Sequence, residues 1–283
     1  MPSSRATAAI AVAVAGPLFL GACSAPQPGP TSPDKSSTAP APGHAHGIYA
    51  STDGSKVLVA THNGVLDYST GTPKLVGEAN DYMGFTGDGN VFYASGHPRP
   101  GSKQINPLGL VRSEDSGASW TTLSNEGISD FHALTVTRDG VVGYDGGLKT
   151  TTDFKSWSPT GAQLKVAALA GRPETSTVLA TTESGVQRST DSGRSWVPVA
   201  GSPIVQFASL ASPDVAVGVA PDGSVYTSSD AGLTWTETGS IAGEVEALYA
   251  TADTGGAVSV WVFASGGLQV SRDGGKSFSA FRP

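Results

Sequence analysis

The eight residues at positions 189–196, STDSGRSW, decide the fold because close copies of them recur along the chain. Three copies at 113–120, 228–235 and 271–278 share the pattern Ser-x-Asp-x-Gly-x-Ser/Thr-Trp/Phe, and a fifth at 151–157 lacks the glycine. The aspartates at the third position lie 38 to 43 residues apart: Asp115, Asp153, Asp191, Asp230 and Asp273. Five copies at this period indicate a repeat protein in which each repeat is one supersecondary unit.

Each copy lies between two β-rich runs, such as GVQR before and WVPV after residues 189–196, and this context predicts a hairpin turn. In such a turn the aspartate accepts amide hydrogen bonds, glycine supplies a positive φ, and the aromatic ring packs between sheets. These tasks are structural, so we do not expect the five aspartates to form an active site. The pattern resembles the Asp-box (BNR) repeat of β-propellers, found in sialidases, sortilin-type receptors and photosystem assembly factors.

A second marker sets the number of repeats. A glycine opens the strand before each copy and before a degenerate copy that begins in HNGVLDYSTG: Gly64, Gly109, Gly147, Gly185, Gly223 and Gly267. We therefore expect an all-β protein, a β-propeller of six four-stranded blades over residues 44–283, with about 40 residues per blade. The chain should begin on an innermost strand and end on an outermost one. A seventh blade would need a repeat that carries neither marker.

The N-terminal segment predicts export and a lipid anchor. A positive start, an apolar run and the residues LGAC at 20–23 resemble a bacterial lipoprotein signal, and Cys23 is the only cysteine. We expect a signal peptide over 1–22, and a lipidated Cys23 with a Pro/Ser-rich disordered tether over 23–43. The protein would then sit at the extracytoplasmic face of the cell membrane; the alternative is an ordinary secretory signal. The net charge of −7 argues against nucleic acid as a partner, because phosphate binding needs a basic surface.

Aligned innermost strands gather polar side chains at one end of the central channel, here called the channel mouth. The strands are expected at 44–50, 81–87, 130–136, 165–171, 206–212 and 244–250. Their third position holds His46, Met83, His132, Ala167, Ala208 and Glu246. Their first position holds His44, Asp81, Asp130, Lys165, Gln206 and Glu244. Residues two apart share a face of a strand, and the loops after the second strands should add His62, His97, Asp145, Glu183 and Asp222.

One interpretation of this cluster is a transition-metal site. Imidazole and thioether groups are ligands that copper and zinc prefer. The candidate ligands are His44, His46, His62, Met83, His97 and His132. Asp81 and Asp130 could bind the ion themselves or orient the imidazoles. The simpler alternative is that strands beside an aqueous channel tolerate polar residues and bind nothing.

A second interpretation is glycoside cleavage. The segments HGIYAS, ATHNG, YMGF, YASGHPRPGS, NPLGL and DFHAL resemble a group of bacterial Asp-box lipoproteins that are commonly labelled glycosyl hydrolases or exo-α-sialidases. That resemblance implies carboxylates as acid and base, with Asp81, Asp130, Asp145 and Glu246 as weak candidates, and Tyr82, Arg99, Tyr144 and Glu244 as ligand-binding residues. Strict sialidase activity is not expected, because the chain has no Arg-Ile-Pro signature and Arg99 is the only arginine expected at the mouth.

A third interpretation is a protein-docking scaffold. The loop at 95–108, SGHPRPGSKQINPL, is the longest interruption of the repeat and carries two positive charges on an acidic domain. It could act as a lid or a partner contact, or it could be an insertion without function. The sequence therefore leaves three ligand classes open at the mouth: a metal, a glycan or other small molecule, and a protein.

Overall fold

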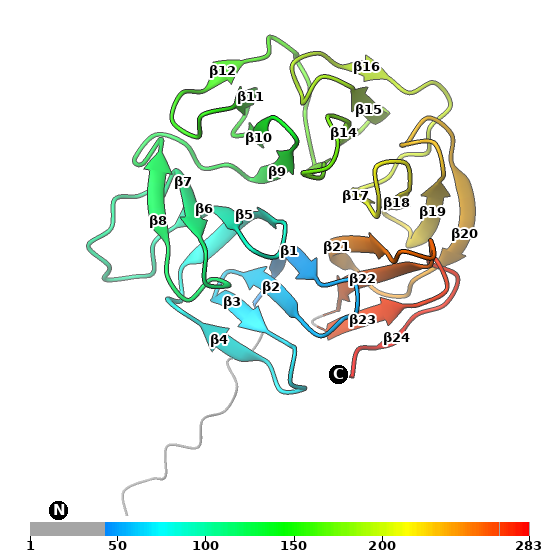
Figure 1. Ribbon diagram of the computed structural model, residues 1–283, viewed down its shortest axis with the longest axis horizontal. Helices are drawn as coiled ribbons and strands as arrows, with labels where there is room; N and C mark the ends of the chain where they lie inside the picture. The colour runs from blue at the N-terminus through cyan, green and yellow to red at the C-terminus, as the bar shows by residue number, and fades with distance from the viewer. Residues whose placement is uncertain (1–42, 266, 283) are drawn as a thin grey trace, which may run out of the picture. The chain divides into compact units, whose positions relative to one another are not determined.

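The computed structural model describes residues 43–265 and 267–282. In this part of the chain, 24 strands form six antiparallel sheets of four strands each, arranged around a central axis (Figure 1). The predicted six-bladed β-propeller is confirmed, and the described residues form no seventh blade. The predicted signal peptide, the lipidation site Cys23 and the tether up to residue 42 lie outside the described residues.

The bounds of the strands follow the repeat. The innermost strands are β1 (Ala45–Ala50), β5 (Asp81–Gly87), β9 (Ala133–Thr137), β13 (Ala168–Ala170), β17 (Phe207–Leu210) and β21 (Val245–Ala252). The second strands are β2 (Val57–Thr61), β6 (Phe92–His97), β10 (Gly140–Tyr144), β14 (Val178–Thr182), β18 (Ala216–Val219) and β22 (Val258–Ala264). The third strands are β3 (Gly64–Asp67), β7 (Leu110–Ser113), β11 (Leu148–Thr151), β15 (Gly185–Ser189), β19 (Ser224–Ser228) and β23 (Gly267–Ser271). The outermost strands are β4 (Lys74–Val76), β8 (Thr121–Ser124), β12 (Ser158–Pro159), β16 (Val197–Pro198), β20 (Thr236–Ser240) and β24 (Ser279–Ala280).

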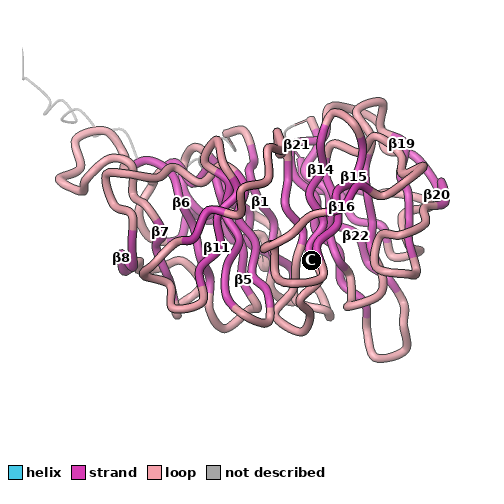
Figure 2. Tube along the Cα trace, turned by 90° about the horizontal axis from the view of Figure 1, so that it is seen from above, coloured by secondary structure: helices cyan, strands magenta, loops and turns pink. Residues whose placement is uncertain are grey.

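Every blade is built from consecutive residues. Within each sheet the strands follow chain order from innermost to outermost, as predicted. The innermost strands contact their neighbours around the ring, and β1 lies beside β21 (Figure 1). Seen from the side, the strands run through the thickness of the propeller and the loops lie at its two ends (Figure 2). The ring therefore closes by packing of the first blade on the last, without exchange of a strand.

The burial pattern explains the apolar runs in the sequence. The second strands β2 and β14 are buried at every position, whereas β12, β16 and β24 are exposed. A strand covered on both faces by neighbouring sheets needs a continuous apolar run. The core consists of clusters that each join two adjacent blades. For example, Ile48 and Val59 of the first blade pack with Trp261 and Phe263 of the sixth.

The repeated aspartates stabilise turns. Asp115 accepts hydrogen bonds from the Ser113 hydroxyl at 2.8 Å and from the amide and hydroxyl of Ser119 at 2.8 and 2.6 Å. Trp120 donates its indole N–H to the Gly117 carbonyl at 3.1 Å, which fixes the ring against the turn. Equivalent bonds occur at the other full copies: Asp191, Asp230 and Asp273. In the copy without glycine, Asp153 still accepts the amides of Lys155 and Ser156.

Two predicted innermost strands begin three residues later than expected. The strand expected at 165–171 is β13, which begins at Ala168, and the other is β9. The alignment placed an innermost strand at 130–136, but β9 begins at Ala133. The reason is that Phe131 donates its amide to the Ser95 hydroxyl of the second blade at 2.9 Å instead of joining its own sheet. Asp130 and His132 therefore lie in a segment that bridges two blades just before the strand starts.

Candidate metal centre

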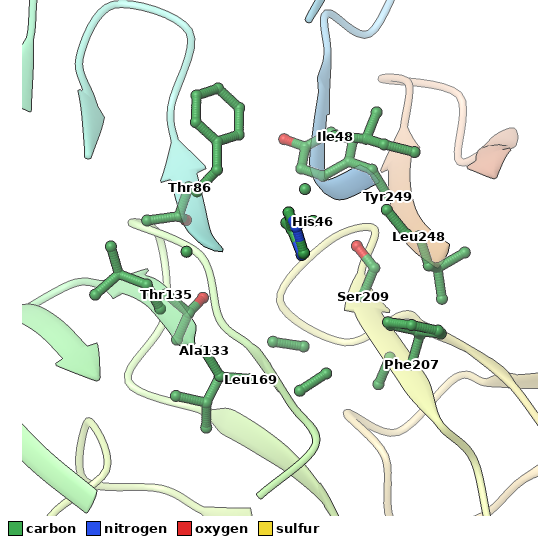
Figure 3. A pocket seen from close by; sticks show the side chains of 18 of the residues that line it. His46, Ile48, Thr86, Ala133, Thr135, Leu169, Phe207, Ser209, Leu248 and Tyr249 are labelled. Atoms are coloured by element: carbon green, nitrogen blue, oxygen red, sulfur yellow. The ribbon is translucent and has the colours of Figure 1, made fainter. Parts of the chain in front are cut away.

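The six innermost strands surround a central cavity of about 210 Å³. Apolar side chains line much of it, including Ile48, Leu169 and Leu248, and hydroxyl groups from other strands lie between them (Figure 3). At one end the lining changes to His44, His46, Met83, His132 and Glu246. With Ala167 and Ala208, which also line it, the structure thus brings seven of the aligned first-position and third-position residues to one cavity.

β-Bulges bring three of these side chains to the channel. In β1, Ala45 pairs with Thr61 and Gly47 with Ala60, so that His46 is an extra residue. Met83 in β5 and Glu246 in β21 occupy the same extra position between paired neighbours. A bulge bends its strand and redirects one side chain. The sequence alignment assumed regular alternation and did not anticipate these bulges.

The histidines of the first blade form a compact group. Ligand nitrogens of His44, His46 and His62 all lie within 4.8 Å of one another. Nε2 of His46 lies 3.3 Å from both ring nitrogens of His62. The rings of His46 and His62 meet edge to face with centroids 4.4 Å apart. His44 and His46 come from the start of β1 and His62 from the β2–β3 loop, so one blade supplies all three.

A carboxylate orients this group. Asp81, the first residue of β5, accepts a hydrogen bond from Nδ1 of His62 at 2.8 Å. The proton on Nδ1 leaves the lone pair of Nε2 available, and this arrangement is common for histidines that bind metals. Burial, and then the nearby imidazoles of His62 and His44, lower the pKa of His46 to about 4. The ring of His46 is therefore neutral near pH 7, as a ligand must be.

A second group lies on the second and third blades. Oδ2 of Asp130 is 3.1 Å from Nε2 of His97 and 3.4 Å from Nε2 of His132. Nδ1 of His97 lies 2.7 Å from Oδ1 of Asn106, and Nδ1 of His132 lies 3.2 Å from the carbonyl of Asp130. All five histidines are thus engaged near the channel mouth, but in two groups and not one.

Other predicted site residues have separate structural contacts. Glu246 accepts the amide of Ala45 at 2.8 Å and so links the sixth blade to the first. Asp145 forms an ion pair with Lys149 at 2.7 Å within the third blade. Glu244 and Arg99 are exposed, and the Arg99 amide donates to Asn80 at 2.9 Å.

The two tyrosines expected to face a ligand lie in or against the core. Tyr82 is completely buried, its ring lies 5.0 Å from that of Trp120, and its hydroxyl is bonded by Asn80. Burial raises the pKa of Tyr82 well above its usual range. The expectation that Tyr82 contacts a sugar is wrong, because the ring fills the space between the first two blades. Tyr144 is half-buried and packs against the cluster around Val142.

The sequence did not indicate Asn106 as part of the site. It lies nine residues after His97, at the far end of the predicted loop, and reaches the imidazole because that loop folds back. An asparagine in a Pro-rich loop has many structural explanations, so its type and spacing gave no signal.

Comparisons with known proteins agree with the architecture. No family model and no curated protein matches the chain. Among solved structures, a GH74 xyloglucanase from Xanthomonas campestris is similar with a TM-score of 0.55 and 15% identity, over 86% of this chain and 46% of the xyloglucanase. A GH74 enzyme from Niastella koreensis has a TM-score of 0.61 and 18% identity, over 86% of this chain and 38% of the enzyme.

The likeness is one of fold. The chain spans less than half the length of these two GH74 structures. YCF48 bound to a D1 peptide is also similar, with a TM-score of 0.53 and 17% identity, over 86% of this chain and 83% of YCF48. At such identities the shared feature is the β-propeller, and one propeller architecture serves unrelated functions.

Proposed function

We propose that this protein is a metal-binding β-propeller that holds a zinc or copper ion at His44, His46 and His62. The observation that carries the proposal is the convergence of three imidazoles within 4.8 Å. Histidine pairs two residues apart are common, but a third ring from another loop is needed to complete a site. Here the β2–β3 loop supplies it.

The spacing of the nitrogens supports a shared ion. In a tetrahedral zinc site with Zn–N bonds of about 2.0–2.1 Å, neighbouring ligand nitrogens are roughly 3.3 Å apart. Nε2 of His46 and Nε2 of His62 are 3.3 Å apart. Two neutral imidazoles at this distance need either a hydrogen bond or a cation between them. A neutral His62 ring that donates its Nδ1–H to Asp81 presents the lone pair of Nε2, which is the form that a metal ligand needs.

Three histidines leave one position of a tetrahedral site for water or a ligand. Met83 lines the same cavity, and a thioether there would favour copper over zinc. If Cys23 is lipidated as the sequence predicts, the ion would be held at the outer face of a membrane.

Metal uptake tests the proposal directly. Chelator-stripped protein is equilibrated with Zn²⁺ or with Cu²⁺, and bound metal is measured by elemental analysis. We expect His46→Ala and His62→Ala each to lose one bound ion relative to the unmodified chain. Glu244→Gln, a change of an exposed carboxylate in the same region, should keep the full complement. Equal metal content in the unmodified chain and both histidine variants would refute the proposal.

Glycoside cleavage has weaker support. The GH74 neighbours share the fold, but the four candidate carboxylates of this chain are already engaged. Asp81 and Asp130 contact histidines, Asp145 pairs with Lys149, and Glu246 binds a backbone amide. A general acid must protonate a leaving group and needs access to it, and these contacts compete with that role.

Protein docking is a second candidate, favoured by one surface feature. Ile105 and Ile128 are 55% and 77% exposed. Pro107 and Gly127 join the long loop to the neighbouring turn by a backbone hydrogen bond of 2.7 Å. The loop that carries Ile105 also carries Asn106, so a partner docked there would sit beside the channel mouth.

A further inference from the structure

A second cavity lies at the end of the channel opposite the histidines. It has a volume of about 220 Å³ and is here called the far pocket. The innermost strands start at the channel mouth, so the residues that end these strands and the loops after them lie at the other end (Figure 2). Five of the six blades contribute to its walls, through residues that include Tyr49, Thr86, Asp88, Arg172, Ser209 and Thr251.

Arg172 supplies the positive charge of the far pocket and follows β13 of the fourth blade. Its side chain is 21% exposed. Nε donates a hydrogen bond to Oε2 of Glu174 at 3.1 Å, and Nη1 donates to the Leu210 carbonyl at 3.2 Å. A guanidinium carries further N–H groups, and all of them are donors. Arg172 therefore offers donors to a molecule in the pocket while its other contacts hold it in place.

Two carboxylates of the far pocket supply acceptors. Asp88, which follows β5, accepts the amides of Asn90 and Val91 at 2.8 and 2.9 Å through Oδ1. Glu174 uses Oε2 for the contact with Arg172. Within the described residues, Oδ2 of Asp88 and Oε1 of Glu174 have no hydrogen-bond partner. Each carboxylate therefore keeps one oxygen available as an acceptor.

Hydroxyl groups complete the wall. Ser209 accepts the amide of Ala250 at 2.9 Å, which leaves its own proton available for donation. Burial raises the pKa of Tyr249 to about 12, so this hydroxyl keeps its proton near pH 7. Thr251 is 4% exposed, and its hydroxyl has no partner within the described residues. Since buried polar groups are normally paired, the wall holds hydrogen-bonding capacity that the described part of the protein does not use.

The mixture of charges selects the class of ligand. An anion in the far pocket would meet Asp88 and Glu174, and a cation would meet Arg172. A hydroxyl group both donates and accepts, so a neutral molecule with several hydroxyls satisfies the carboxylates and the guanidinium together. The volume lies below the roughly 300–1,000 Å³ of sites for drug-sized molecules. We propose that the far pocket binds a small neutral polyol such as a monosaccharide.

Saturable binding of a sugar tests the proposal. The purified full chain, stripped with a chelator so that no metal at the mouth binds the probe, is titrated with D-glucose, D-galactose or myo-inositol. Binding is measured by saturation-transfer NMR. D-glucuronate and D-glucosamine are probes of similar size that carry a charge. We expect at least one neutral probe to bind saturably, and both charged probes to bind roughly tenfold more weakly or not at all.

A substitution at Asp88 assigns the binding to the far pocket. Asp88→Asn keeps one oxygen for the amides of Asn90 and Val91 but replaces the unpaired oxygen with an NH₂ group. We expect binding to weaken by roughly tenfold or more, because a hydrogen bond to a charged acceptor is lost. Asp253→Asn is the matched control and should bind as the unmodified chain does. Asp253 also accepts two amides of its own turn, but it lies outside the pocket.

A substitution at Tyr49 gives an independent reading. Tyr49→Phe removes a hydroxyl that lies near Asp88 and Arg172 and keeps the ring that packs on Phe92. Binding should weaken by roughly 3–10-fold. The proposal is overturned if no neutral probe binds saturably, if a charged probe binds more tightly than every neutral one, or if both variants bind as the unmodified chain does. The far pocket contains no histidine, so none of these results bears on the proposed metal site.

Discussion

At the residue scale, the three-histidine group depends on a carboxylate from the neighbouring blade, because Asp81 accepts a hydrogen bond from Nδ1 of His62. The register of the innermost strands predicted His46, Met83, His132 and Glu246 at one cavity, and the structure places them there. The division into two groups could not be predicted, because it depends on side-chain conformations and on the path of the long loop. The contact of Asp81 with His62 is an example, since it joins two blades through side chains alone.

The role of Asp81 can be measured. Asp81→Ala should weaken zinc binding at the three-histidine site by roughly 10–100-fold, because the tautomer and direction of the His62 ring are no longer fixed. Competition with a chromophoric chelator measures the affinity. Asp145→Ala is the matched control and should bind zinc as the unmodified chain does. An unchanged affinity in Asp81→Ala would show that the carboxylate does not orient the site.

At the element scale, local signals were sufficient for the hairpin turns and insufficient for the bulges. The aspartate, serine and glycine of each repeat bond within one turn, so their spacing alone predicts it. A bulge is set by the pairing of two strands and by the adjacent blade. A small residue follows each bulge: Gly47, Gly84 and Ala247. The structure shows for Gly84 why a larger residue would not fit. A Cβ atom on Gly84 would lie 2.3 Å from the Phe131 carbonyl of the next blade.

This close approach predicts a loss of stability. Gly84→Ala forces the second and third blades apart, and overpacking of this kind costs about 1–3 kcal/mol. For a domain of this size each kcal/mol lowers Tm by roughly 2–4 °C. Gly147→Ala is the matched control, because a Cβ atom there meets nothing within 4 Å. Calorimetric melting of both variants gives the comparison, and equal Tm values would argue against the close contact between blades.

At the scale of the whole molecule, the period of the repeat predicted the number of blades and the contiguous order of their strands. The contacts between blades could not be predicted from the sequence, because each core cluster joins residues of different blades. The repeated aspartates also have a global effect. Hydrogen bonds from Ser119 lower the pKa of Asp115 from 3.8 to about 2, and hydrogen bonds from Thr234 do the same for Asp230.

These shifts predict acid unfolding. A carboxylate whose pKa is lower in the folded state stabilises that state fully above its ordinary pKa of 3.8. The contribution is lost as the pH falls towards 2, when the folded carboxylates are protonated. We expect the unfolding midpoint in urea to fall between pH 4 and pH 2, measured by tryptophan fluorescence. Asp230→Asn should flatten this dependence, and a slope equal to that of the unmodified chain would contradict the role of the turns.

Closure of the ring without strand exchange has a consequence for biosynthesis. Among the described residues, the sixth blade covers the apolar face of the first blade that carries Ile48 and Val59, through Trp261 and Phe263. Translation makes the first blade early and its cover last, and partly folded chains with exposed apolar surface are prone to aggregate. The apolar face of the first blade therefore remains without its covering blade until the sixth blade has been synthesised.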